Sequence, residues 1–355
     1  MNLIKTISIN VIITLALVAL ILLCPPVIYA TYTFFKPDKK DDRASLVIYQ
    51  KFDWAEVHFE EFRSLDTTYF DFVVWKRNDF TGETITIKDG TRKTINSVYP
   101  LHANIKYAFF GGSTMWGTGS TNELTIPSQF TKQTKFESYN FGETGYTSRQ
   151  VLANYINFIL GNRIENKDIT NIVFYGGSAD VTIQCRENAR YLSTQREKQI
   201  QQALRSEVKY SYAETFRQVI ELIQRVFNNP KKITHDCHSN PEKAKVVART
   251  IVDSWRTAQH LSQTNNLDFI AVLEPHGYSN SHAKKYLNLD PSLAEQYRVV
   301  YPLIRRFAEE ENINFFDLSF SLNNCRECFI DDLHIGPQGN QRIVKSLISI
   351  ISSNP

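Results

Sequence analysis

The sequence predicts an α/β protein whose mostly buried parallel sheet has helices on both faces. From residue 105 onward, short apolar runs alternate with longer stretches that have helical periodicity. Several of these runs end in glycine and a small polar residue, as expected where a strand turns into a helix. The chain has 355 residues, 42 % of them hydrophobic, which is enough to build a large core. A disordered or fibrous protein is excluded by this composition.

Five short apolar runs are predicted to form the strands. They are 105–110, 138–141, 171–175, 269–273 and 315–316. Helices are predicted after the second strand, where Val151, Leu152, Tyr155, Ile156 and Ile159 share one face, and over 212–227, over 241–263 and from Pro337 to the C-terminus. Charge does not favour a nucleic-acid partner, because 40 Lys+Arg against 37 Asp+Glu leave a net charge of only +3.

The N-terminus predicts a membrane anchor. Residues 6–35 carry no charged side chain, and a bilayer core about 30 Å thick needs roughly 20 apolar residues in a helix. Cleavage as a signal peptide is the alternative, although the apolar run exceeds the roughly 7–15 residues usual there. Positive charges after the segment would leave the C-terminal side inside the cell. We expect instead a single-pass protein of the cell membrane with an extracytoplasmic domain.

Three parts follow from these patterns: an anchor or signal peptide over 1–35, a linker with a small β extension over 36–104, and the α/β domain over 105–355. Strand signals at 69–75 and 84–87, the latter running into Asp89-Gly90, predict the extension. Outside the anchor lie four cysteines, an even number that suits an oxidising compartment. Pairing of Cys185 with Cys237 and of Cys325 with Cys328 is one of three connectivities. Four reduced cysteines in a cytosolic domain are the alternative.

The candidate chemistry lies at the carboxyl ends of the strands, where open parallel sheets bind ligands. Ser113 follows the first strand, and Asp331 and His334 lie three residues apart before the last helix. A serine hydroxyl needs a base to remove its proton, and an imidazole needs a carboxylate to hold its tautomer. The three residues therefore form a candidate Ser-His-Asp triad, with Asp332 as the backup carboxylate.

Four segments together resemble the SGNH/GDSL hydrolase superfamily, from about residue 105 to 350. They are 109–117 with Ser113, 140–148 with Gly145, 173–180 with Gly177 to Asp180, and 329–340 with Asp331 and His334. The resemblance implies a flavodoxin-like α/β/α sandwich and a serine esterase without cofactor or metal. It also implies that Ser113 is the nucleophile and that the N–H groups of Ser113 and Gly145 bind the oxyanion. Where the family has an oxyanion-hole asparagine this chain has Ala179, so Ser178 is considered as a substitute donor.

The expected reaction is hydrolysis of an O-acyl ester, with an O-acetyl group on a cell-surface polysaccharide as the expected substrate. An O-acyltransferase using the same triad, or a non-catalytic carbohydrate-binding or assembly protein of the same fold, are the alternatives. Trp116 and Tyr146 either line the substrate pocket or pack in the core, and Glu274, Pro275 and His276 are expected to face the crevice. The histidines around Cys237 are interpreted as part of a disulfide loop, because no second ligand pair accompanies them.

Overall fold

The computed structural model describes residues 41–96, 102–165, 168–189 and 233–353, with short stretches at 10–11, 13–14 and 194–196 and single residues at 200 and 220. The predicted anchor, apart from these few positions, and the predicted helix over 212–227 lie outside the described residues. Among the residues that are described, none of the helices has the length and apolar character required to span a bilayer.

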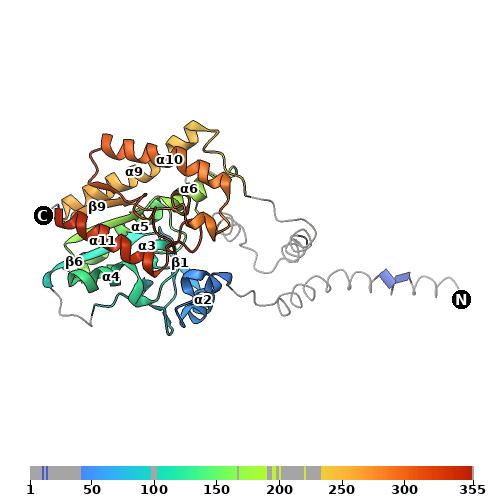
Figure 1. The fold of residues 1–355 in the computed structure, drawn as a ribbon, viewed down its shortest axis with the longest axis horizontal. Coiled ribbons are helices and arrows are strands. Elements are labelled where there is room, and N and C mark those ends of the chain that lie inside the picture. Colours follow the sequence, from blue (N-terminus) through green and yellow to red (C-terminus); the bar gives the residue numbers. More distant parts are fainter. Residues whose placement is uncertain are drawn as a thin grey trace. The chain divides into compact units, whose positions relative to one another are not determined.

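A mixed sheet of eight strands forms the centre of the described part, and five of its strands run parallel (Figure 1). The parallel strands are β6 (His102–Gly111), β7 (Phe136–Asn140), β8 (Asn171–Gly176), β9 (Asp268–Leu273) and β10 (Phe315–Asp317). In space they follow the order β7-β6-β8-β9-β10. The chain adds β7 on one side of β6 and then adds β8, β9 and β10 on the other side, so the strand order reverses between β6 and β8. The predicted α/β class and all five predicted strands are confirmed.

Three antiparallel strands continue the same sheet beyond β7. They are β3 (Phe80–Thr81), β4 (Thr86–Lys88) and β5 (Thr91–Arg92). The turn at Asp89-Gly90 joins β4 to β5, as the sequence predicted, and Arg92 of β5 pairs with Asn140 of β7. The β extension is therefore a structural part of the sheet that carries the C-terminal region.

The strand predicted over 69–75 is wrong in its centre. Its residues form a separate two-stranded hairpin of β1 (Thr67–Phe70) and β2 (Val74–Arg77). The chain turns at Asp71, Phe72 and Val73, and Phe72 has a positive φ of 62°. Aromatic and β-branched residues favour strands, but Val73 is buried at this turn and its position is set by tertiary contacts.

Helices cover both faces of the sheet (Figure 1). Helices α4 and α11 pack together on one face, and α5, α9 and α10 pack together on the other. The α-helices are α2 (Ala55–Ser64), α3 (Ser113–Trp116), α4 (Ile126–Thr134), α5 (Ser148–Glu165), α6 (Ser178–Gln184), α9 (Pro241–Thr264), α10 (Pro291–Glu310) and α11 (Pro337–Ser353). Short 3-10 helices lie at Asp42–Ser45, Val47–Tyr49, Asn122–Leu124, Gly277–Ser279 and Ala283–Lys285.

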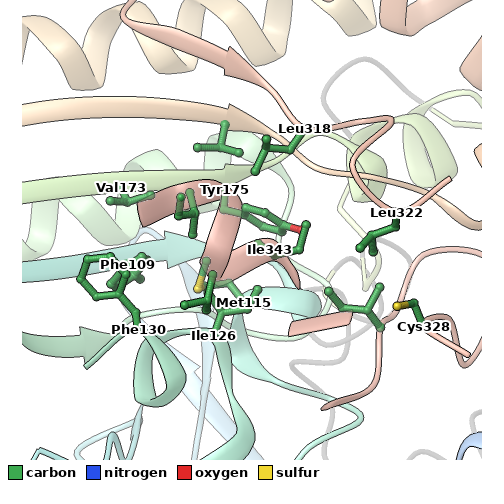
Figure 2. Packing of buried hydrophobic residues seen from close by; sticks show 14 of the residues in the cluster. Phe109, Met115, Ile126, Phe130, Val173, Tyr175, Leu318, Leu322, Cys328 and Ile343 are labelled. Atoms are coloured by element: carbon green, nitrogen blue, oxygen red, sulfur yellow. The ribbon is translucent and has the colours of Figure 1, made fainter. Parts of the chain in front are cut away.

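Alternation along β6 shows why the sheet needs two helical layers. Tyr107 and Phe109 contact Phe130 of α4, whereas the next residue along the strand, Phe110, contacts Tyr155 of α5. Successive side chains of a strand point to opposite faces, so a strand buried on both sides is apolar throughout. Figure 2 shows the α4 and α11 side, where Phe130 and Ile343 pack with residues of the sheet.

Two disulfides join the cysteines in the predicted pairs. Cys185 bonds to Cys237 across a sequence separation of 52 residues, with a Cα–Cα distance of 5.2 Å. Cys325 bonds to Cys328 in the loop that leads to Asp331 and His334. The bond to Cys185 therefore occupies the sulfur of Cys237, which lies between His235 and His238.

Candidate active site

Ser113 lies at the carboxyl end of β6, beside the point where the strand order reverses. It is the first residue of the short helix α3, and Gly112 precedes it in an extended conformation. The turn is tight, because a Cβ at Gly111 would lie 2.8 Å from the Cβ of Met115. Open α/β sheets bind ligands outside the carboxyl ends of strands at such a reversal. The fold therefore places this hydroxyl at the edge of the sheet where proteins of this class bind ligands.

The three residues predicted as a triad meet in one hydrogen-bonded chain. The Nε2 atom of His334 lies 2.6 Å from the Oγ of Ser113, and its Nδ1 lies 2.6 Å from the Oδ2 of Asp331. When Nδ1 carries the proton and donates a hydrogen bond to the carboxylate, Nε2 can accept a hydrogen bond from the serine hydroxyl. Ser113 is separated from His334 by 221 residues, so the fold alone brings these groups together.

Hydrogen bonds and the neighbouring His334 stabilise the charged form of Asp331. Its Oδ1 accepts the backbone N–H of Leu333 at 3.0 Å and that of His334 at 2.7 Å. Burial acts to raise its pKa, but attraction to His334 and these hydrogen bonds outweigh burial and lower the pKa to about 2. Burial and the charge of Asp331 raise the pKa of the neighbouring Asp332 to about 6. Asp331, and not Asp332, is therefore the carboxylate that contacts the imidazole.

This arrangement predicts an acid-sensitive contribution to stability. The pKa of Asp331 is about 2 in the folded chain, against an ordinary value of 3.8. A lowered folded-state pKa stabilises the fold above the ordinary value, here by about 2 kcal/mol, and this stabilisation disappears as the pH falls toward the folded value. We expect urea unfolding of the native chain and Asp331→Asn to give a free-energy difference that shrinks below about pH 4. A difference that stays constant down to about pH 2 would contradict this origin.

Two backbone N–H groups are the candidate oxyanion donors. Among the described residues, neither the N–H of Ser113 nor that of Gly145 has a hydrogen-bond acceptor. Gly145 adopts a positive φ of 78°, a conformation that glycine reaches without the penalty of a Cβ. A Cβ at Gly142 would lie 2.5 Å from the N of Trp116, so the loop of Gly145 presses directly against α3.

Ser178 does not fit the substitute role considered for it. Its N–H donates to Oε1 of Glu274 at 3.0 Å, and its hydroxyl donates to the same oxygen. Both donors are thus committed to a buried carboxyl group, and the substitute-donor prediction is corrected. Ala179 follows with a methyl group, which cannot donate a hydrogen bond.

Glu274 lies behind the triad in a buried position, 3 % exposed. Burial raises its pKa, while Ser178, the charge of His334 and Thr114 act in the opposite direction. The carboxyl group thus connects the start of α6 to the helix of the nucleophile. His276 is also buried and stacks on Tyr297 with a ring separation of 4.2 Å, so it packs against the tyrosines of α10.

Trp116 and Tyr146 pack and do not line an open pocket. Trp116 is 1 % exposed, and the guanidinium carbon of Arg92 lies 4.2 Å from the centroid of its ring. Tyr146 is 1 % exposed, packs edge-on against Trp75 and donates its hydroxyl to the carbonyl of Trp75. Of the two interpretations of these aromatic residues, core packing is therefore the one that the structure supports.

The described chain resembles several solved structures. A carbohydrate acetylesterase family member from Sinorhizobium meliloti is 14 % identical, covering 70 % of this chain and 97 % of that chain, with a TM-score of 0.36. An alpha/beta hydrolase enzyme from the metagenome of Lake Arreo, Spain, is 13 % identical, covering 72 % of this chain and 98 % of that chain, with a TM-score of 0.39. No curated protein matches the sequence.

A family model settles the relationship that the sequence motifs suggested. The model of the GDSL-like lipases and acylhydrolases matches residues 107–347, which is more than half of the chain. The matched range runs from β6 to α11 and includes Ser113, Gly145, Asp331 and His334. The chain therefore belongs to the GDSL-like lipase/acylhydrolase family and is an ester hydrolase.

Proposed function

We propose that the chain hydrolyses O-acyl esters with Ser113 as nucleophile, His334 as general base and acid, and Asp331 as the group that orients His334. The observation that carries this proposal is the unbroken chain of hydrogen bonds from the Ser113 hydroxyl through both nitrogens of His334 to the carboxylate. A binding protein that merely kept the fold has no need for this alignment, so the geometry favours a working enzyme.

The reaction proceeds in two halves. The Oγ of Ser113 attacks the ester carbonyl while its proton passes to Nε2 of His334, and the N–H groups of Ser113 and Gly145 bind the oxyanion. His334 then protonates the leaving alcohol, which departs and leaves an acyl group on Ser113. A water molecule loses its proton to His334, attacks the acyl carbonyl, and releases the carboxylic acid with the serine hydroxyl restored.

The proposed substrate is an O-acetyl group on a cell-surface polysaccharide. Family membership supports the ester, and the two disulfides together with the apolar N-terminal run support action outside the cytoplasm. The O-acyltransferase alternative differs only in whether a sugar hydroxyl or water attacks the acyl-serine.

Assays on p-nitrophenyl acetate and labelling with a fluorophosphonate probe test the proposal on the full-length chain. We expect labelling and hydrolysis in the native protein and neither in Ser113→Ala, because the probe reacts with an activated serine. Ser321→Ala is the matched control, since this serine lies in a loop and, among the described residues, its hydroxyl bonds only to the carbonyl of Leu318. Labelling that persists in Ser113→Ala would refute the role of Ser113. Hydrolysis that drops when a sugar acceptor takes the acyl group would support the transferase.

Ala179 predicts a gain of function. The family resemblance puts an oxyanion-donating asparagine here, and loss of one such donor costs about 10²–10³ in kcat. Ala179→Asn is therefore expected to raise kcat on p-nitrophenyl acetate by at least about 10-fold, since the added amide supplies a third donor. Ala179→Leu, which adds similar bulk and no donor, is the control. An Asn variant that is no faster than the Leu variant would show that the site has no place for this donor.

A further inference from the structure

The loop that carries Gly145 depends on one residue of the N-terminal extension, Arg77 at the end of β2. The guanidinium Nε lies 3.3 Å from Oε1 of Glu143, and the backbone N–H of Arg77 donates to Oε2 of the same carboxylate at 3.1 Å. The Nη2 atom donates to Oγ1 of Thr144 at 2.8 Å. Arg77 therefore holds the two residues that immediately precede Gly145.

Glu143 in turn fixes the backbone beside Gly145. Its Oε1 accepts the N–H of Thr144 at 2.6 Å, and its own N–H donates to the carbonyl of Gly111 at the end of β6 at 3.1 Å. Burial raises the pKa of the Glu143 carboxyl, while Arg77 and the donors of Thr144 act against burial. The guanidinium of Arg77 thus favours the charged form of this buried carboxyl group.

The hairpin also holds the loop on the other side of Gly145. Tyr146 donates its hydroxyl to the carbonyl of Trp75, and Gln150 donates its amide to the carbonyl of Val73 at 3.0 Å. The β1–β2 hairpin forms its own two-stranded sheet and shares no ladder with the main sheet. Its side chains and carbonyls therefore make the junction with the loop.

Arg77 contacts the helix of the nucleophile as well. Its guanidinium lies 5.4 Å from the ring centroid of Trp116 in α3, and the side chains of Arg77 and Glu143 are 7 % and 3 % exposed. A single buried cation thus touches both segments that supply the candidate oxyanion donors, α3 with Ser113 and the loop with Gly145. An arginine suits this task because its planar fork can bond two acceptors while its face lies on an aromatic ring.

We propose that Arg77 is a positioning residue of the esterase, and that the β1–β2 hairpin clamps the Gly145 loop so that its N–H points at the oxyanion. This inference rests on the oxyanion role of Gly145 in the proposed function. A donor that acts on the oxyanion contributes in the transition state and little in the ground state, so its displacement lowers kcat and leaves KM nearly unchanged.

Arg77→Met is expected to lower kcat on p-nitrophenyl acetate by about 10²-fold with little change in KM. Arg77→Lys keeps the charge but loses the forked guanidinium, so its kcat is expected to lie between those of the native chain and Arg77→Met. Phenylboronic acid, which forms a tetrahedral adduct with an active-site serine, is expected to lose affinity by about the same factor as kcat. Partial unfolding of the variant would instead lower the concentration of active enzyme, while the folded fraction would bind the boronate with native affinity.

Arg249→Met is the matched control. Arg249 bonds the carboxylates of Glu310 and Glu311 and, like Arg77, lies over an aromatic ring, that of Phe307. Its removal is expected to leave kcat and boronate affinity unchanged, because it contacts neither segment of the site. Should Arg77→Met fail to fold, Thr144→Val and Tyr146→Phe provide the test. The first removes the hydroxyl that accepts from Arg77 and donates to Glu143, and the second removes the hydroxyl that donates to Trp75. Neither change separates the buried Arg77 from the carboxylate of Glu143.

The two proposals fail in distinguishable ways. An active, labelled Ser113→Ala would remove the proposed function and the clamp together. An inactive Ser113→Ala combined with native kcat in folded Arg77→Met, or in both Thr144→Val and Tyr146→Phe, would overturn the clamp alone. A lowered kcat accompanied by weaker boronate binding in these variants supports it.

Discussion

Replacement of His334 with alanine is expected to lower kcat on p-nitrophenyl acetate by about 10⁶, close to the effect of removing the serine itself. The Nε2 atom lies 2.6 Å from the Ser113 hydroxyl and is the base that this hydroxyl contacts. Without His334, no base accepts the proton of Ser113 as its oxygen attacks, and no acid protonates the leaving alcohol. Initial rates and active-site titration of the purified variant measure the loss.

His260→Ala is the control for this change. His260 is an exposed residue of α9, and its removal is expected to leave kcat at the native value. A His334→Ala variant with a rate close to that of the native chain would mean that another group takes the proton. The assignment of the general base would then be wrong even if Ser113 were labelled.

Asp331→Asn is expected to lower kcat by about 10⁴ with little change in KM. An amide can donate to Nδ1 of His334, which then carries its proton on Nε2 and cannot accept the proton of Ser113. The loss therefore comes from the wrong imidazole tautomer and not from a missing contact. Steady-state kinetics across the pH range separate this effect from a change in substrate affinity.

Asp332→Asn is the matched control, because this adjacent carboxyl group makes no hydrogen bond to His334 among the described residues. It is expected to keep most of the native kcat. Equal losses in the two variants would indicate that local charge, and not the bond to Nδ1, supports the reaction.

The sheet and the triad could be predicted because each depends on a local signal. The strand at 171–175 is apolar along its whole length, as a strand buried on both faces must be, and it ends in two glycines. Ser113 follows the end of such a segment, and Asp331 and His334 precede the last helix, where the family places its functional groups. The order of these segments along the chain was therefore enough to predict that the three residues form one site.

The contacts around Gly145 could not be predicted in this way. Arg77 and Glu143 are 66 residues apart, and nothing in the spacing of either residue indicates that they meet in a buried pair. The same limit explains the turn at Phe72, where tertiary contacts override strand propensity. It also explains Ser178, whose hydroxyl is occupied by Glu274, a residue 96 positions further along the chain.

The most direct test of the account is to trap the acyl-enzyme. The full-length chain is mixed with p-nitrophenyl acetate, quenched in acid during the first turnovers, digested and analysed by tandem mass spectrometry. We expect one acetyl group, on Ser113, in the native chain and none in Ser113→Ala. Acetyl transfer to a different residue, or hydrolysis with Ser113 never acylated, would contradict it.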